Sequence, residues 1–263
     1  MYYQSTKDFI KGSAKTILEH GQKGSIGYWQ GVDKFINDPI KEMANVYSSC
    51  PMGNNKSISI LASETKADLP WAEDHFQERI NPKNFGLALN PGESYKWWPH
   101  AKFKEEGDEF KNQKKTKDSE KFSHTYMERF WPPDKKGVRF NMANWGKFIE
   151  TAKKNPTSRQ LYFPIWYPED TDASFQGERV PCSLGYHFQY FHGYLHLSYF
   201  IRSCDLHKHF RNDVYFTIRL AQELKSQVPE YKNVPLGNLN MWIGNLHCFL
   251  NDEWKVKKWI HDI

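Results

Sequence analysis

Two adjacent runs of aromatic and aliphatic residues constrain the fold of this sequence more than any other feature. They lie at Val180–Phe191 and Tyr194–Arg202, and only His192-Gly193 separates them. Such a pair is typical of the two-residue turn of a β-hairpin, so two antiparallel strands are predicted here. The run Leu239–Phe249 has the same strand-like character. Together these runs predict a mostly antiparallel or mixed sheet.

Helical spacing and turn residues suggest the elements around this sheet. Apolar spacing predicts a helix over residues 5–20 with Gly21 as its stop, and further helices over 71–80 and 145–154. The remaining predictions are a short helix around Val32–Val46, a short strand at Ile58–Leu61, and a helix that Asn212 caps and that carries Val214, Ile218, Ala221 and Leu224. There is no repeat and no Gly/Ser linker, so we expect one α+β domain over residues 1–263.

Composition excludes several classes of protein. The chain has 10 Trp, 14 Tyr and 18 Phe, enough apolar area to exclude disorder. No run of about 18 uncharged apolar residues occurs, and residues 1–15 lack the apolar stretch of a secretory signal, so a cytoplasmic protein without a membrane span is expected. The net charge of +5 is too small to indicate a nucleic-acid-binding domain. The lysine-rich segment 101–124 is interpreted as a charged surface insertion.

The four cysteines argue for free thiols and against a metal site. Cys50, Cys182, Cys204 and Cys248 form no C-x-x-C pair, so no zinc site is predicted. One of them can be a nucleophile, although a buried cysteine that only packs is more common.

The C-terminal half collects groups that suit an anionic substrate. A guanidinium beside a hydroxyl, as in Arg202-Ser203, is a good phosphate ligand pair, and a carboxylate accepts hydrogen bonds from an amino group on a base edge. The segment therefore suggests a nucleotide or phosphorylated-metabolite site. Its candidates are Arg159, Cys182, Arg202, Ser203, Asp205, Asp213 and His247.

Several separated motifs resemble the thymidylate synthase superfamily. Pro181-Cys182 resembles its nucleophile motif, Arg202-Ser203-Cys204-Asp205 its Arg-Ser-x-Asp motif, and Gly244–His247 a later one. As in that family, the Arg lies 20 residues after the Cys, and the position that reads the pyrimidine, here Asp213, lies 11 residues after the Arg. Pro156–Gln160 resembles the upstream Asp-Ser-Arg-Arg motif.

Within the superfamily the pattern most resembles the deoxycytidylate hydroxymethylases of T-even phages. Phe210–Asp213 matches their Phe-Arg-Asn-Asp, and Pro91–Trp98 resembles their Pro-Gly-Glu-Thr-Pro-Lys-Ile-Trp. Asp213 stands where enzymes of deoxyuridylate have Asn. A carboxylate accepts from the 4-amino group of cytosine but opposes the 4-carbonyl of uracil, a mismatch of about 1–3 kcal/mol. Because Asn212 is adjacent, a shift of one residue would reverse this interpretation.

The resemblance implies a role for each candidate. Cys182 is expected to add to carbon 6 of the pyrimidine. Arg202, Ser203 and, on weaker grounds, Lys56 bind phosphate, and Arg159 does so from the other subunit of a homodimer. Asp205 orients the base and the pterin, and His247 contacts the sugar 3′-hydroxyl. The remaining roles fall to Tyr126 as active-site tyrosine, Trp98 as a wall of the folate site, and Glu73, with Glu78 as the alternative, as general acid–base.

Departures from the family pattern qualify these expectations. Gln160 replaces a second phosphate-binding Arg, and Phe249 replaces a Tyr that contacts the sugar, which leaves deoxyribose against ribose open. His209 replaces a Gly near the cofactor. Only 16 residues follow His247. Trp259, Ile260 and Ile263 would therefore have to close the C-terminal segment over folate. A segment that closes less tightly would admit water.

The resulting expectation is a homodimeric enzyme that transfers the one-carbon unit of 5,10-methylenetetrahydrofolate to carbon 5 of deoxycytidylate and adds water. One alternative is a methylase of deoxycytidylate or deoxyuridylate that releases dihydrofolate. Another, of a different class, is a non-catalytic nucleotide-binding protein.

Overall fold

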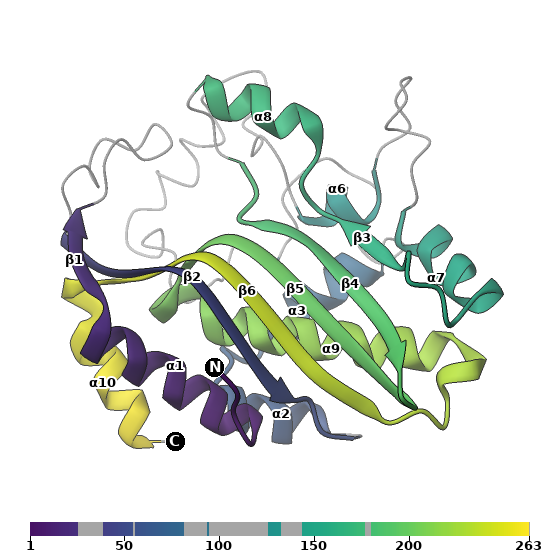
Figure 1. The fold of residues 1–263 in the computed structure, drawn as a ribbon, viewed down its shortest axis with the longest axis horizontal. Coiled ribbons are helices and arrows are strands. Elements are labelled where there is room, and N and C mark those ends of the chain that lie inside the picture. The colour runs from purple at the N-terminus through teal and green to yellow at the C-terminus, as the bar shows by residue number, and fades with distance from the viewer. Residues whose placement is uncertain are drawn as a thin grey trace.

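The computed structural model describes residues 1–25, 39–54, 56–81, 94, 126–132, 144–176 and 180–262. In these residues one mixed sheet has the strand order β1-β2-β6-β5-β4-β3 (Figure 1). The strands are β1 (Gln22–Ser25), β2 (Pro39–Pro51), β3 (Tyr162–Pro164), β4 (Ser183–Phe191), β5 (Tyr194–Asp205) and β6 (Leu236–Phe249). Strands β5 and β6 run parallel, and the other neighbours are antiparallel. The α+β class and the mixed sheet are thus confirmed.

The predicted hairpin forms β4 and β5. Phe191 pairs with Tyr194, and the two residues between them have positive φ angles, 48° at His192 and 82° at Gly193. A tight turn of this kind needs positive φ at both central residues, and glycine adopts it without a steric cost.

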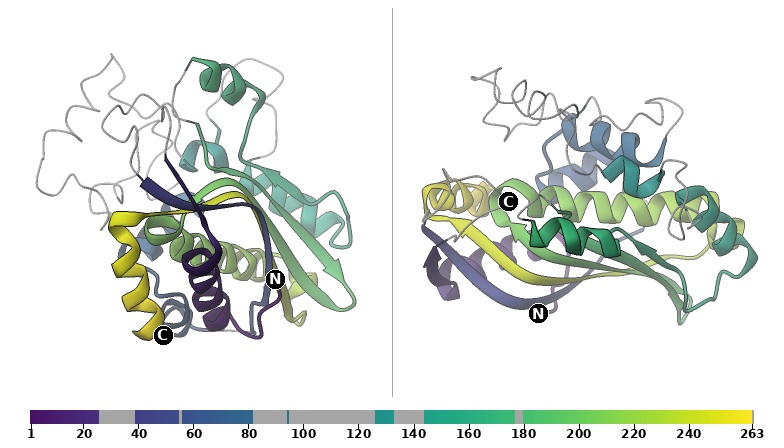
Figure 2. Two further views of the ribbon diagram at one scale, coloured as in Figure 1. Left: turned by 60° about the vertical axis from the view of Figure 1, so that its left-hand side comes forward. Right: turned by 90° about the horizontal axis from the view of Figure 1, so that it is seen from above.

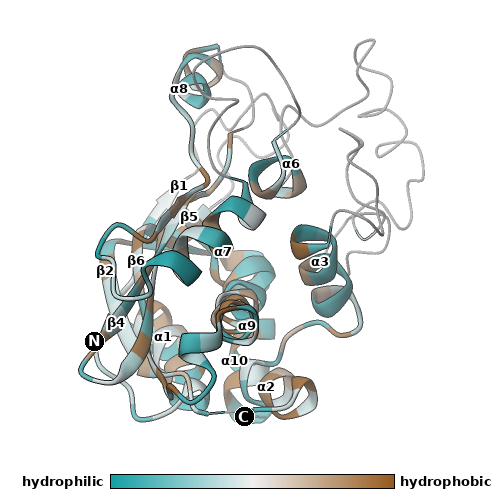
Figure 3. Cartoon of the chain, turned by 90° about the vertical axis from the view of Figure 1, so that its right-hand side faces the viewer, coloured by the Kyte–Doolittle hydropathy of each residue, from teal (hydrophilic) through white to brown (hydrophobic). Residues whose placement is uncertain are grey.

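The helices gather on one face of the sheet. Helices α1 (Thr6–His20) and α9 (Arg211–Gln227) pack on the strands, and α3 (Trp71–Ile80) packs on α9 (Figures 2 and 3). The others are α2 (Ile58–Thr65), α6 (Tyr126–Phe130), α7 (Trp145–Lys154), α8 (Pro168–Phe175) and α10 (Glu253–Asp262), with a π-helical turn at Leu206–Phe210 and 3-10 turns at Pro229–Tyr231 and Leu250–Asp252. Of the described helices, none is long and apolar enough to cross a membrane.

The aromatic residues form much of the core. Phe130, Trp145, Phe148, Phe163 and Phe188 pack ring against ring between the helices and the sheet, with centroids 4.8–6.1 Å apart. Each buried aromatic side chain removes a large apolar area from water. This cluster anchors α6 and α7 beside β4.

Some predicted elements were wrong. Ile58–Leu61 lies in helix α2, because the Ser57 hydroxyl accepts a hydrogen bond from the Ile60 amide and caps a helix there. Residues 39–46 belong to strand β2, where a helix around Val32–Val46 was predicted; residues 32–38 and the 101–124 segment lie outside the described residues. The helices predicted at 5–20, 71–80 and 145–154 are confirmed as α1, α3 and α7.

Asn212 does not cap α9. It lies inside that helix, where its amide donates to the Asp68 carboxylate at 2.9 Å and accepts from the Asp68 backbone at 3.0 Å. The cap is Asp205 instead, whose carboxylate accepts from the amides of His207 and Lys208 at the start of the π-helical turn. The chain then continues into α9 without interruption.

Candidate active site

The hairpin places Cys182 beside Arg202. The Arg202 amide donates to the Cys182 carbonyl at 2.8 Å, in line with the β4–β5 pairing. The Arg202 guanidinium then turns back along the chain, and its Nε donates to the Pro181 carbonyl at 3.0 Å and its Nη2 to the Val180 carbonyl at 3.3 Å. Arg202 therefore fixes the segment that carries the thiol.

Cys182 differs from the other three cysteines in exposure. Cys50, Cys204 and Cys248 are buried, whereas Cys182 is half-buried at the edge of the core. Burial raises the pKa of Cys50 and Cys248 to about 12 and raises the pKa of Cys204 well above its usual value. These three thiols stay protonated and inert, which leaves Cys182 as the candidate nucleophile.

Hydroxyl groups gather next to the thiol. The Ser183 hydroxyl donates to the Tyr126 hydroxyl at 3.3 Å and also bonds the Tyr199 hydroxyl. Burial raises the pKa of Tyr126, and the neighbouring Cys182 acts in the same direction, so Tyr126 is a neutral phenol. It can donate a hydrogen bond to a substrate.

Asp213 lies near these groups, and Asn212 is turned away from them. The Cys204 thiol donates to Asp213 Oδ2 at 3.6 Å, whereas Asn212 is turned away to Asp68. Burial raises the pKa of Asp213 to about 7, although Arg79 and the Cys204 thiol act to lower it. Asp213 therefore exchanges a proton near neutral pH, unlike an ordinary aspartate.

A second cluster lies where β5 and β6 end. Asp205 and His247 are register partners, and His247 Nδ1 lies 3.1 Å from the Asn245 side-chain oxygen. Burial acts to raise the pKa of Asp205, but Lys208 and His247 outweigh it and hold that pKa below its usual value. The Lys208 ammonium lies 3.3 Å from Asp205 and 4.4 Å from the centre of the Phe249 ring. An ionised carboxylate and an ammonium thus stand together here.

The two clusters belong to one site. Asp213, Asp205 and Cys182 all lie close enough to the buried Cys204 thiol to raise its pKa. Ser203 lies between Arg202 and Cys204 on β5 and is half-buried. Cys182, Asp213 and Asp205 therefore lie around the end of a single strand.

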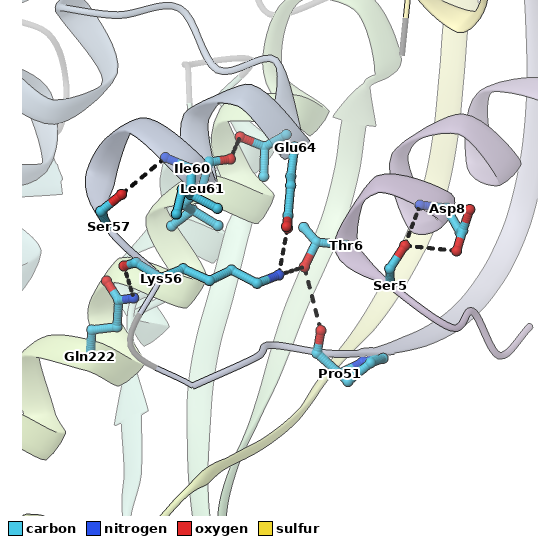
Figure 4. Close-up of polar contacts among 11 residues, drawn as sticks. Ser5, Thr6, Asp8, Pro51, Lys56, Ser57, Ile60, Leu61, Glu64 and Gln222 are labelled. Atoms are coloured by element: carbon cyan, nitrogen blue, oxygen red, sulfur yellow. Dashed lines mark hydrogen bonds and ion pairs between the residues drawn. The ribbon is translucent and has the colours of Figure 1, made fainter.

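Lys56 is engaged elsewhere. Figure 4 shows its ammonium between Glu64 and Thr6, at 2.5 Å and 3.1 Å, and its carbonyl oxygen accepts from Gln222. Gln222 lies nine residues along α9 from Asp213, about 13 Å of helix rise. The structure does not bring Lys56 together with the other candidates.

Glu73, on α3, is held by two side chains of α9. Arg219 clamps its carboxylate with bonds of 3.0 and 2.9 Å, and the Tyr215 hydroxyl donates at 2.6 Å. Burial acts to raise the pKa of Glu73, but these bonds lower it overall. Glu78, the alternative, is buried and accepts bonds from the amide and hydroxyl of Ser94.

The remaining candidates lie apart from the cysteine or outside the described residues. Arg159 is exposed before β3, and its carbonyl lies 3.0 Å from His187 Nε2. Trp98 lies outside the described residues, as does most of Pro91–Trp98, of which Ser94 is described. Trp259 is buried in α10 under the Arg211 guanidinium.

Sequence reasoning missed Arg79, which reaches the site from α3. Its guanidinium lies 4.2 Å from the centre of the Tyr126 ring, and it influences the charge of Asp213. Arg79 follows Glu78 on a helix whose charged residues are typical of a solvent-exposed face. The available signal was the helical spacing of His75 and Arg79, which places the two side chains on one face.

Comparison with known proteins gives a family for the chain. The sequence profile of the family described as thymidylate synthase matches residues 93–262. This chain belongs to the thymidylate synthase family. Members of the family transfer a one-carbon unit from methylenetetrahydrofolate to a pyrimidine nucleotide. A search of curated proteins found no match.

The fold agrees as well. The structure of thermostable thymidylate synthase A from Bacillus subtilis superposes with a TM-score of 0.65 at 15% identity, covering 98% of this chain and 84% of that one. The two chains therefore share a fold at low sequence identity.

The exposure of the cysteines predicts selective labelling. In the native protein at pH 7.5, iodoacetamide should modify Cys182 and leave Cys50, Cys204 and Cys248 unmodified, because a buried thiol with a raised pKa reacts slowly. Peptide mass spectrometry locates the label, and Cys182→Ser is the control that should abolish it. Equal labelling of Cys204 would contradict the assignment.

Proposed function

We propose that this family member is a deoxycytidylate 5-hydroxymethylase that uses 5,10-methylenetetrahydrofolate as co-substrate. Deoxycytidylate, methylenetetrahydrofolate and water give 5-hydroxymethyldeoxycytidylate and tetrahydrofolate. The one-carbon unit keeps its oxidation state, so no hydride donor is required. The proposal includes neither a metal nor contact with nucleic acid or membrane.

The observation that carries the proposal is the carboxyl of Asp213 beside the Cys204 thiol, on which Cys182 also acts. With a pKa of about 7, Asp213 can accept from the 4-amino group of cytosine and share its proton with ring nitrogen 3. Uracil offers a carbonyl and an N–H at these positions, so the ionised carboxylate would oppose the 4-carbonyl as a second acceptor. The site therefore complements cytosine.

Addition of Cys182 to carbon 6 makes carbon 5 nucleophilic. Negative charge then develops in the ring, and a proton held between Asp213 and nitrogen 3 stabilises it. The buried phenol of Tyr126, next to Ser183, orients groups beside the thiol. Methylenetetrahydrofolate supplies the carbon, and carbon 5 then loses its proton to a base.

Glu73 is our candidate for moving protons and ordering water, with Glu78 as the alternative. To take that role, either carboxylate would have to break the hydrogen bonds that now hold it. Glu73 would have to leave Arg219 and Tyr215, and Glu78 would have to leave Ser94. Either exchange would occur as substrate and folate enter.

Phosphate and sugar would bind along β5 and β6. In the described residues Nη1 of Arg202 has no hydrogen-bond partner, and together with the Ser203 hydroxyl it suits a phosphate oxygen. His247 would contact the 3′-hydroxyl. The ionised Asp205 suits the amino and ring N–H donors of a pterin, and Trp98 would line the same side.

The uncovered face of the sheet supports a homodimer. Tyr47, Trp242 and Phe200 are neighbours across β2, β6 and β5, and Tyr162 continues the row 6.3 Å from Phe200. Tyr47 and Tyr162 are 57% and 43% exposed, and no described helix covers this face (Figure 3). A second copy of the chain fits it, since contiguous exposed aromatic residues mark protein interfaces. Arg159 lies near this face, beside His187, and would reach the partner's phosphate site.

A shared site predicts complementation between inactive variants. Arg159→Ala and Cys182→Ser should each lower activity by more than a hundredfold, which for the arginine corresponds to a lost charged hydrogen bond of about 3 kcal/mol. A mixed dimer contains one site free of both changes, so mixing should restore up to about a quarter of the activity. No recovery, with mixed dimers demonstrated by native mass spectrometry, would contradict the shared site.

The product decides between the proposal and its alternatives. With deoxycytidylate and methylenetetrahydrofolate, mass spectrometry should show addition of CH2O and release of tetrahydrofolate. Stoichiometric dihydrofolate, followed by its absorbance, would instead establish a methylase. A 5-fluoropyrimidine nucleotide with methylenetetrahydrofolate should trap a covalent adduct at Cys182. Absence of both adduct and turnover, with nucleotide bound, would establish a binding protein.

The role proposed for Asp213 predicts which base the enzyme prefers and how its kcat/KM depends on pH. Asp213→Asn should lower kcat/KM for deoxycytidylate by roughly a hundredfold and raise it for deoxyuridylate, because the amide donates to the uracil carbonyl. Since protonated Asp213 predominates below its raised pKa, wild-type kcat/KM on deoxycytidylate should fall above about pH 7. This fall of kcat/KM at alkaline pH should be absent in Asp213→Asn. Asn212→Ala is the control, and a change of base preference there would move the role to Asn212.

A further inference from the structure

Arg79 places a buried positive charge at the wall of the candidate site. Its side chain extends from α3 between two rings, 4.2 Å from the centre of Tyr126 and 4.6 Å from that of Phe216. Only 5% of the residue is exposed. A guanidinium stacked on aromatic faces away from water is held in one position and keeps its charge.

A directed chain of hydrogen bonds fixes this guanidinium. Arginine can only donate, so His75 Nε2, 2.8 Å from Arg79 Nη2, is the acceptor. His75 Nδ1 therefore carries the hydrogen and donates to the Ser94 hydroxyl at 2.9 Å, and that hydroxyl donates to Glu78. Burial lowers the pKa of His75, which agrees with a neutral ring. The chain runs from Arg79 to a buried carboxylate.

The guanidinium lies against α9, the helix that carries Asp213, because it stacks on Phe216 there. Phe216, on which Arg79 stacks, lies one turn after Asp213 in α9, and Arg79 is the cation that lowers the pKa of this carboxyl against the effect of burial. Within the described parts of the chain, the other titratable groups that interact with Asp213 are neutral phenols and a neutral thiol from three further elements: Tyr126, Tyr186, Tyr199 and Cys204.

We infer that Arg79 is a positioning residue that sets the protonation of Asp213 and orients Tyr126, and that the His75–Ser94–Glu78 chain holds it in place. Without this charge, Asp213 would remain protonated well above neutral pH and could not pass its proton to the ring as charge develops. Arg79 thereby tunes recognition of the base without touching it. The inference rests on the proposed function, because Asp213 has this role only if a pyrimidine binds beside it.

The test titrates Asp213 in the free protein. Its protonated carboxyl is followed by the infrared carbonyl band that disappears in Asp213→Asn. Arg79→Met should raise the midpoint by about one pH unit or more, and Arg79→Lys should return it toward the wild-type value. With deoxycytidylate, Arg79→Met should shift the alkaline limb of kcat/KM by the same amount. Arg129→Met is the matched control, since Arg129 is also buried and stacked on a tyrosine ring but pairs with Asp170.

An unchanged midpoint in Arg79→Met, or an equal shift in Arg129→Met, would overturn the inference. If Arg79→Met does not fold, His75→Phe serves instead, because it keeps the stacking on Trp71 and removes the acceptor that holds Arg79. It should move the midpoint upward by less than Arg79→Met, and no movement would overturn the inference. The titration needs no substrate, so a shifted midpoint in a protein that does not turn over deoxycytidylate would refute the proposed function alone.

Discussion

The antiparallel pairing of β4 with β5 is the constraint on which the site depends. The turn at His192-Gly193 fixes the register as far as Gly185 and Phe200, and a one-residue shift between Gly185 and Ser183 then brings Cys182 against Arg202, where their backbones are bonded at 2.8 Å. The guanidinium then binds the carbonyls of Val180 and Pro181 and fixes the thiol's segment from a second side. A slip of one residue would turn Cys182 to the opposite face of the sheet.

A second constraint is the exclusion of water from the region between α9, α3 and the sheet. Cys204 shows this, since its thiol is buried between Asp213 and Asp205 and its pKa is raised well above the usual value. In such surroundings a charge costs more than in water unless a fixed partner offsets it. Cations and hydrogen-bond donors from other helices and strands offset this cost, and the partner of each carboxylate determines its protonation state.

The sequence predicted the elements with strong local signals. The hairpin, the strand β6 and the helices α1, α3 and α7 were all expected, since apolar periodicity and a tight turn specify them. Ile58–Leu61 was misread as a strand because four apolar-rich residues fit either structure, and the capping by Ser57 decides it. Asn212 was expected to cap the N-terminus of α9. Asp205 provides the cap instead, because a π-helical turn of five residues precedes α9 and extends the helical region. Neither the bond of Lys56 to Thr6 nor the approach of Arg79 to Tyr126 has a local signal, since both join segments far apart in the sequence.

Three carboxylates near α9 illustrate how partners decide function. Burial acts to raise the pKa of all three, yet Glu73 and Asp205 end below their usual values because Arg219 binds the first and Lys208 the second. Asp213 is approached by Arg79 and a weak thiol donor, which offset burial incompletely, and its pKa stays near 7. Groups whose pKa values are pushed apart in one site take different roles in proton transfer. In the free protein Glu73 and Asp205 are ionised at neutral pH, whereas Asp213 can gain or lose a proton there, and the proposed recognition of a cytosine ring depends on that difference.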